Sequence, residues 1–223
     1  MKQNKNNKSF QFILITFLAL LSGTSLQSQT VLLQPAEVYI GTSFGVNGSM
    51  MMFNPTVRQI PLLGYQGGLA FRYITEKHVG LQIEMNYSQR GWDEESGLYS
   101  RRLNYLELPF LTHLYLGNTH RFIFNIGPKV SYLLNETVLI NGMENSDAEQ
   151  HVKPVYFPFD YGLTGGLGYN LHTRRAGVFQ LELRAYYGLS DIFANTKSDY
   201  FANSNHMNAA LSVGWFIQLT GKE

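Results

Sequence analysis

Between residues 65 and 219, apolar or aromatic residues alternate with small, polar or charged ones in seven successive stretches. In the stretch 79–90, for example, Leu81, Ile83 and Met85 alternate with Gln82 and Glu84. Because side chains along a strand have a period of two, these two sets lie on opposite faces. The pattern therefore predicts strands that each have one apolar face and one polar face.

A less regular stretch before these seven brings the number of predicted strands to eight. They lie at residues 37–45, 65–75, 79–90, 102–116, 121–133, 156–170, 177–189 and 206–219. Their connections alternate between long, at 46–64, 91–101, 134–155 and 190–205, and short, at 76–78, 117–120 and 171–176. Outer-membrane barrels have short periplasmic turns and longer external loops. The predicted fold is all-β: an eight-stranded antiparallel up-and-down transmembrane β-barrel.

The two faces of the predicted strands differ in charge. The apolar face carries no Lys, Arg, Asp or Glu on the seven clearest strands. The polar face holds Arg72, Glu84, Glu107, Lys129, Asp160, Glu182 and Arg184, with Arg90 and Arg121 nearer the strand ends. A basic residue turned to lipid at the bilayer midplane costs ~2–4 kcal/mol. The charges are therefore predicted to point inward and to form a structural network that fills the lumen, because eight strands enclose little more than their own side chains.

Aromatic residues gather at both ends of the predicted strands once strand directions are alternated. Tyr65, Tyr87, Tyr132 and Tyr187, with Phe157, fall toward the external side, whereas Tyr73, Tyr169 and Trp215, with Phe122 and Phe179, fall toward the periplasmic side. Amphipathic rings favour the two membrane interfaces. We expect two interfacial girdles.

The N-terminal segment has the layout of a secretory signal peptide. Lys2, Lys5 and Lys8 precede a mainly apolar run at residues 10–21, which small and polar residues follow. That run is too short to cross a bilayer as a helix. We expect residues 1–29 to be a signal peptide that is cleaved between residues 25 and 29, and residues 30–223 to be the barrel domain.

Composition narrows the classes of partner. Without the three N-terminal lysines, 14 basic residues face 16 acidic ones, and the mean hydropathy of the whole chain is −0.13. No nucleic-acid partner is expected from such a balance. Cysteine is absent, which excludes disulfides, thiolate metal sites and a lipidated N-terminal cysteine.

Four segments resemble the PorT-type outer-membrane β-barrel family. They are 103–111 (LNYLELPFL), 126–134 (IGPKVSYLL), 160–169 (DYGLTGGLGY) and 181–189 (LELRAYYGL). The likeness extends over almost all of the chain after the signal segment. It implies an outer-membrane barrel, and the member that gives the family its name implies a role in type IX protein secretion.

Candidate chemistry is sparse. Ser88, Ser190, Asp191 and His206 lie near the predicted external rim and have the residue types of a hydrolase, but external loops are rich in such residues by default. The acidic residues of 93–95 and 144–149 lack the spacing of a calcium loop. The apolar segment 50–53 (MMMF) is expected to be a loop that folds over the barrel mouth or contacts a partner. No cofactor, no metal and no catalytic residue is predicted.

The favoured function is that of a non-enzymatic integral outer-membrane barrel, either structural or part of an export or surface-binding assembly. Its expected partners are outer-membrane lipid, lipopolysaccharide and other envelope or secretion proteins. Two alternatives remain: a lipid-modifying hydrolase at the outer rim, and a soluble calycin-like carrier with an apolar interior, in which the two faces would be exchanged.

Overall fold

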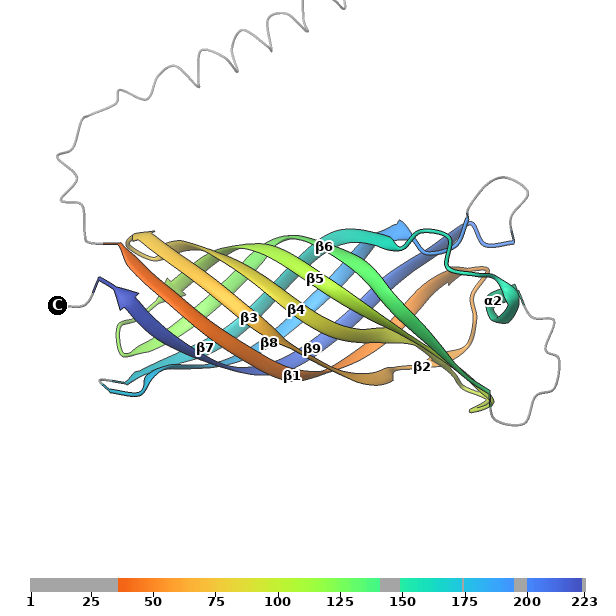
Figure 1. Ribbon diagram of the computed structural model, residues 1–223, viewed down its shortest axis with the longest axis horizontal. Helices are drawn as coiled ribbons and strands as arrows, with labels where there is room; N and C mark the ends of the chain where they lie inside the picture. The colour runs from red at the N-terminus through yellow and green to blue at the C-terminus, as the bar shows by residue number, and fades with distance from the viewer. Residues whose placement is uncertain (1–35, 141–148, 174, 195–199, 222–223) are drawn as a thin grey trace, which may run out of the picture. The chain divides into compact units, whose positions relative to one another are not determined.

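The computed structural model describes residues 36–140, 149–173, 175–194 and 200–221. The predicted signal peptide lies outside these residues. In the described part of the chain, eight long strands and one short strand form a single sheet (Figure 1). The strands are β1 (Glu37–Asn54), β2 (Gln59–Ile60), β3 (Leu62–Glu76), β4 (Val79–Glu94), β5 (Tyr99–Leu116), β6 (His120–Ile140), β7 (Phe159–Thr173), β8 (Gly177–Asp191) and β9 (Asn203–Thr220).

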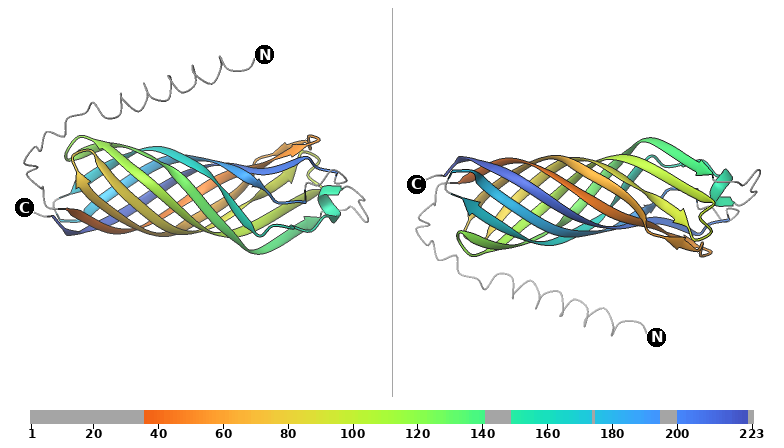
Figure 2. Two further views of the ribbon diagram at one scale, coloured as in Figure 1. Left: turned by 90° about the horizontal axis from the view of Figure 1, so that it is seen from above. Right: turned by 90° about the horizontal axis from the view of Figure 1, so that it is seen from below.

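The sheet closes on itself. The strands follow the order β2-β4-β3-β1-β9-β8-β7-β6-β5, and a further antiparallel pairing of β4 with β5 joins the last long strand to an earlier one. Apart from β1 with β9 and β1 with β3, every neighbouring pair of long strands is consecutive in the sequence. The views from above and below show the strands winding obliquely around the barrel (Figure 2). The predicted eight-stranded antiparallel barrel is confirmed.

Burial alternates along the strands as the sequence predicts. On β4, Leu81, Ile83 and Met85 are exposed on the outer surface, whereas Gln82 and Glu84 are buried in the lumen. The same alternation continues on β8 and β9. This arrangement contradicts the soluble carrier alternative, since such a carrier would have an apolar interior.

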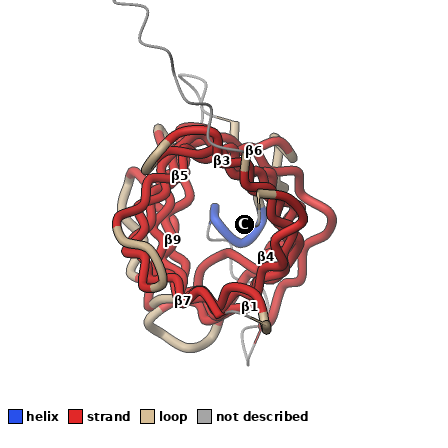
Figure 3. The backbone as a smooth tube through the Cα atoms, turned by 90° about the vertical axis from the view of Figure 1, so that its left-hand side faces the viewer, coloured by secondary structure: helices blue, strands red, loops and turns tan. Residues whose placement is uncertain are grey.

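The two ends of the barrel differ. At the terminal end, where β1 begins and β9 ends, short turns join β3 to β4, β5 to β6 and β7 to β8. At the opposite end, here called the loop end, the connections hold β2 and the four-residue helix α2 (Glu149–Val152). The helix α2 lies at the loop end (Figure 1), and seen from the terminal end it falls within the outline of the barrel (Figure 3). No helix among the described residues is long and apolar enough to span a membrane.

Several predicted strand boundaries are wrong at the loop end. The predicted loop at 46–64 is largely the continuation of β1 and the start of β3, and the predicted loop at 91–101 reduces to the residues between β4 and β5. Met51 and Phe53 are buried strand residues, so the expectation of a loop at 50–53 is also wrong. The strands continue because β1 pairs with β9 as far as Asn54, opposite Asn203.

An aromatic cluster fills the lumen where these strands extend. We call it the loop-end plug; its buried members are Met51, Phe53, Trp92, Tyr99, Leu103, Tyr105, Ile192, Phe193 and Phe201. The ring centroids of Phe53 and Trp92 are 5.3 Å apart in an edge-to-face arrangement, and those of Phe53 and Phe201 are 4.9 Å apart. Such geometry is favourable for aromatic pairs.

Candidate functional site

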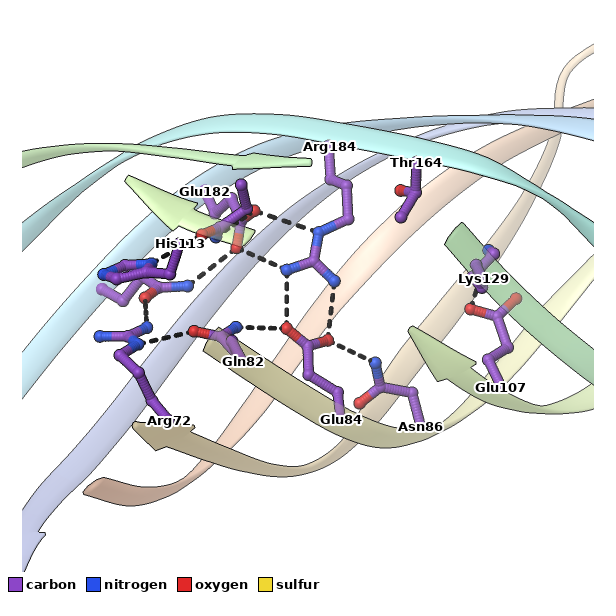
Figure 4. A network of polar contacts seen from close by, with 12 residues as sticks. Arg72, Gln82, Glu84, Asn86, Glu107, His113, Lys129, Thr164, Glu182 and Arg184 are labelled. Carbon is purple, nitrogen blue, oxygen red and sulfur yellow. Dashed lines mark hydrogen bonds and ion pairs between the residues drawn. The ribbon is translucent and has the colours of Figure 1, made fainter. Parts of the chain in front are cut away.

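The centre of the lumen holds an ion cluster built around Arg184 on β8 (Figure 4). Its Nη1 and Nη2 donate to the two carboxylate oxygens of Glu84 on β4, at 2.7 and 2.8 Å. Its Nε and Nη2 also donate to Glu182, at 3.1 and 2.8 Å. The planar guanidinium suits such forked contacts to carboxylates. Arg184 therefore neutralises two buried acids from opposite sides of the barrel.

Arg72 on β3 is connected to the same acids through two glutamine side chains. Its Nε donates to Gln82 Oε1 at 2.6 Å, and Gln82 Nε2 donates to Glu84 at 2.5 Å. Its Nη2 donates to Gln180 Oε1 at 2.5 Å, and Gln180 Nε2 donates to Glu182 at 2.8 Å. Each amide accepts from the cation and donates to the anion. The central cluster thus holds two cations and two anions in a continuous network.

The network extends toward the terminal end through Asn125 and His113. Asn125 Nδ2 donates to Glu182 Oε1 at 2.9 Å, and its Oδ1 lies 2.7 Å from His113 Nδ1. Because the amide oxygen can only accept, His113 Nδ1 is the donor. On the side toward the terminal end, the guanidinium of Arg72 lies over the ring of Phe216, 4.1 Å from its centroid. Phe216 packs with Tyr39, Ile74 and other apolar side chains at the terminal end of the lumen.

A second ion cluster lies between the central cluster and the loop-end plug. Arg90 on β4 contacts Glu107 at 3.1 Å and Asp160 at 2.8 Å. Lys129 Nζ is 3.0 Å from the other oxygen of Glu107, and the hydroxyl of Tyr186 donates to Asp160 at 2.9 Å. All of these side chains are buried. Two cations again face two anions.

The structure brings together all seven charged residues predicted for the lumen: Arg72, Glu84, Glu182 and Arg184 in the central cluster, and Glu107, Lys129 and Asp160 in the second. Arg90, which sequence reasoning placed nearer a strand end, joins Glu107 to Asp160. Arg121 lies apart from both clusters and pairs with Glu37 at 3.2 Å.

Sequence reasoning missed the neutral members of this interior. Gln82 and Gln180 connect Arg72 to the two acids through hydrogen bonds, and Asn125 connects His113 to Glu182 in the same way. Their positions on the polar faces of strands were visible, but the contacts depend on which strands face one another across the lumen. The loop-end plug was also missed. Ser49, Met51 and Phe53 are every second residue of β1, and they continue its inward face toward the loop end.

All of the predicted girdle residues except Phe157 lie on strands of the outer wall, whereas Phe157 lies in the connection between β6 and β7. Tyr65, Tyr87, Tyr132, Tyr187, Tyr73 and Trp215 are exposed, and Tyr169 is half-buried. The indole Nε1 of Trp215 donates to the backbone oxygen of Ala176 at 2.6 Å, and Tyr169 contacts His120. These contacts hold two rings near the turns of the terminal end.

The residues with hydrolase chemistry do not form a Ser–His–acid constellation. In the described part of the chain, neither serine hydroxyl is hydrogen-bonded to His206: Ser88 accepts from Asn47 at 3.1 Å, and Ser190 donates to Asp160 at 2.6 Å. His206 is fully buried and lies 3.1 Å from the hydroxyl of Tyr105. Among the described residues, no three metal-ligating side chains form a group that could hold an ion. What the geometry presents is a packed and charge-balanced interior.

Comparison with known proteins places the barrel in a family. The profile of the family described as "Outer membrane protein beta-barrel domain" matches residues 27–194. The match stops before β9, which completes the barrel in the structure. No curated protein matches the chain.

Solved barrels resemble this chain at low identity. OprG from Pseudomonas aeruginosa is 12% identical, with a TM-score of 0.47, over 83% of this chain and 97% of that one. Ail of Yersinia pestis is 13% identical, with a TM-score of 0.43, over 81% and 99%. The outer membrane enzyme PagL is 12% identical, with a TM-score of 0.46, over 79% and 98%. None of these matches specifies the PorT type, so that resemblance stays a prediction.

Proposed function

The chain belongs to the outer membrane protein beta-barrel domain family and is located in the outer membrane, and from this premise we propose a non-enzymatic integral barrel with a filled lumen. Its role would be structural, or that of a component of an export or surface-binding assembly of the PorT kind. The surfaces at its two ends, rather than the lumen, would then carry the function.

The packed lumen is the observation that supports this proposal. Two ion clusters and the loop-end plug occupy successive levels along the barrel. In the clusters, four cations face four anions: Arg72, Arg90, Lys129 and Arg184, and Glu84, Glu107, Asp160 and Glu182. A buried ion that lost its partner would be costly, so the clusters resist the rearrangement that opening a pore would need.

The same proposal orients the barrel. The terminal end, with its short turns, would face the periplasm, and the loop end would face the exterior, as in other outer-membrane barrels. The outward-facing tyrosines and Trp215 would then lie at the two membrane interfaces, and the apolar wall between them would contact lipid and lipopolysaccharide.

Exposed aromatic residues at the loop end suit contact with another envelope protein. Tyr156 and Phe157, in the connection between β6 and β7, are exposed and pack edge-to-face with centroids 4.7 Å apart. Tyr200 is also exposed, in the connection that leads to β9. Large aromatic side chains are enriched in the parts of interfaces that contribute most to binding.

Conductance tests the filled lumen. The purified barrel inserted into a planar bilayer should give no stepwise channel openings, whereas an open porin measured in the same way gives them. Stable openings from the wild-type protein would contradict the proposal, since ions cannot cross the two clusters without displacing their side chains.

A deletion strain tests the assembly role. We expect altered secretion or surface display of other proteins, with lipid A of unchanged mass. The double variant Tyr156→Ala/Phe157→Ala should fail to restore the phenotype, whereas Phe122→Ala, an exposed aromatic residue at the terminal end, should restore it. A changed lipid A mass in the deletion strain would favour the hydrolase reading instead.

A further inference from the structure

The outer wall of the barrel carries an apolar groove of about 700 Å³, a volume typical of small-molecule sites. Its floor is a row of four small residues on four neighbouring strands. Gly48 on β1 pairs with Ala209 on β9, Ala209 with Ala185 on β8, and Ala185 with Gly165 on β7. At ~4.8 Å between strands, this floor is ~14 Å long.

Rows of large side chains flank the floor on both sides. Toward the terminal end, the next outward-facing row is Val46, Leu211, Leu183, Leu167 and Phe124. Toward the loop end, the next row is Met50, Met207, Tyr187 and Leu163. The rows are spaced two residues apart along each strand, because every second side chain faces outward. The floor therefore lies between two ridges, and we call this hollow the trough. The loop-end ridge lines the trough directly, and the terminal-end ridge borders the floor through strand register.

The ends of the trough are partly closed. At one end lies Ile126 of β6, which pairs with Gly165 of β7. At the other end lie Pro61 and Leu63, and Leu63 of β3 pairs with Gly48 of β1. Thr164, Tyr186 and Asn208 also line the trough, although they are buried residues of the inward face. Among the described residues, no charged side chain lines the trough, so this lining offers contacts to hydrocarbon rather than to a headgroup.

We propose that this trough binds one acyl chain of a lipopolysaccharide molecule in the external leaflet. The trough is continuous with the wall that contacts membrane hydrocarbon, and an unfilled hollow there would forfeit dispersion contacts. A second barrel would present its own convex wall and would meet the two ridges before reaching the floor.

The choice of lipopolysaccharide depends on the orientation given under the proposed function. The trough is adjacent to Tyr187, a residue of the external girdle, on the side toward the middle of β8. It would therefore open to the external leaflet, which lipopolysaccharide forms. A single chain held in the trough would bind more tightly than the chains that contact the smooth wall elsewhere.

Two glycines of the floor allow the trough to be filled without disturbing the barrel. A Cβ atom added at Gly165 would approach only the backbone oxygen of Asn125, at 3.9 Å, and one at Gly48 would meet Pro61 at 3.7 Å. Valine is favoured in strands. Gly48→Val/Gly165→Val should therefore fold, and Gly165→Ala provides a milder second variant. Leu81→Phe, which adds apolar volume on the outer surface of β4, is the matched control.

The experiment measures lipid that remains bound to the purified barrel through repeated washes in mild detergent, by native mass spectrometry. Wild type and Leu81→Phe should each retain one lipopolysaccharide molecule, and the double valine variant should lose retention about tenfold, equivalent to ~1.4 kcal/mol. Heat-modifiable migration on gels checks that each variant is folded.

Three results would overturn the proposal: equal retention in all folded variants, loss of retention in Leu81→Phe, or a wild-type dimer that the valines dissociate. Trough-dependent retention of phospholipid instead of lipopolysaccharide would overturn the leaflet assignment and with it the orientation. Neither the conductance nor the deletion experiment depends on the trough, so a failure here is distinguishable from a failure of the proposed function.

Discussion

Arg184→Gln tests whether the ion clusters stabilise the barrel. The substitution removes the guanidinium that donates four hydrogen bonds to Glu84 and Glu182. Both acids have side chains at most 4% exposed, so solvent cannot replace the lost donor. Breaking a buried ion pair by removing one partner costs ~3–5 kcal/mol. We expect the free energy of unfolding to fall by about that amount, a large part of the ~5–15 kcal/mol that is typical of folded proteins.

A double variant separates the ion pair from general damage to packing. Glu84→Gln/Arg184→Gln removes one anion and one cation, which leaves Arg72 and Glu182 joined through Gln180. Because the remaining charges balance, the double variant should recover ~2 kcal/mol relative to the sum of the two single changes. Arg184→Lys keeps the charge but loses the forked geometry, so it should fall between wild type and Arg184→Gln.

The assay is reversible urea unfolding of the barrel in lipid vesicles at pH 7, followed by tryptophan fluorescence and by heat-modifiable migration. An Arg184→Gln variant whose free energy of unfolding lies within ~0.5 kcal/mol of wild type, the range of ordinary surface substitutions, would show that the central cluster does not stabilise the barrel. Simple addition of the effects of the single changes would also contradict the ion pair, because contacting residues should be energetically coupled.

Three further predictions concern the outer wall and the plug. Ile83→Arg should reduce the stability of the membrane-inserted barrel by ~2–4 kcal/mol, and Thr75→Arg, at the exposed end of β3, by ~0–1 kcal/mol, in the same urea titration; equal effects would contradict the assigned lipid face. Since the chain lacks cysteine, a lipid-soluble maleimide should label Ile83→Cys and leave Gln82→Cys unlabelled, and the reverse result would mean that the faces are exchanged. Trp92→Ala should cost ~3–5 kcal/mol because it removes a fully buried ring from the plug, whereas the exposed Phe122→Ala should cost far less; similar losses would contradict the role of the plug.

The faces of the strands were predictable from local pattern. Leu81 and Glu84 are an odd number of residues apart in one strand. A period of two therefore assigns them to opposite faces without knowledge of any partner strand. The number of long strands followed from the same alternation, together with the alternation of long and short connections between the stretches. Strand ends at the loop end were not predictable by this rule, because Met51 and Phe53 are apolar and nevertheless face inward.

The partners within the lumen were not predictable from pattern. Arg184 and Glu84 are 100 residues apart, on strands separated by β3, β1 and β9 in the sheet, and they meet across the lumen. The balance of inward charges indicated that pairing was feasible, but any of the cations was compatible with any of the acids. The glutamine relays of Arg72 depend on the same long-range placement.

The sequence by itself determined the alternation, the strand number, the sign of each face and the barrel class, because all of these depend on the two-residue period of a strand and on the high cost of placing charge in hydrocarbon. Tertiary structure alone decided which ions pair, how far the strands extend and where Gly48, Ala209, Ala185 and Gly165 align into a trough. These features depend on register between strands, which backbone hydrogen bonds set around the closed barrel, and a shift of two residues would keep every face while changing every neighbour.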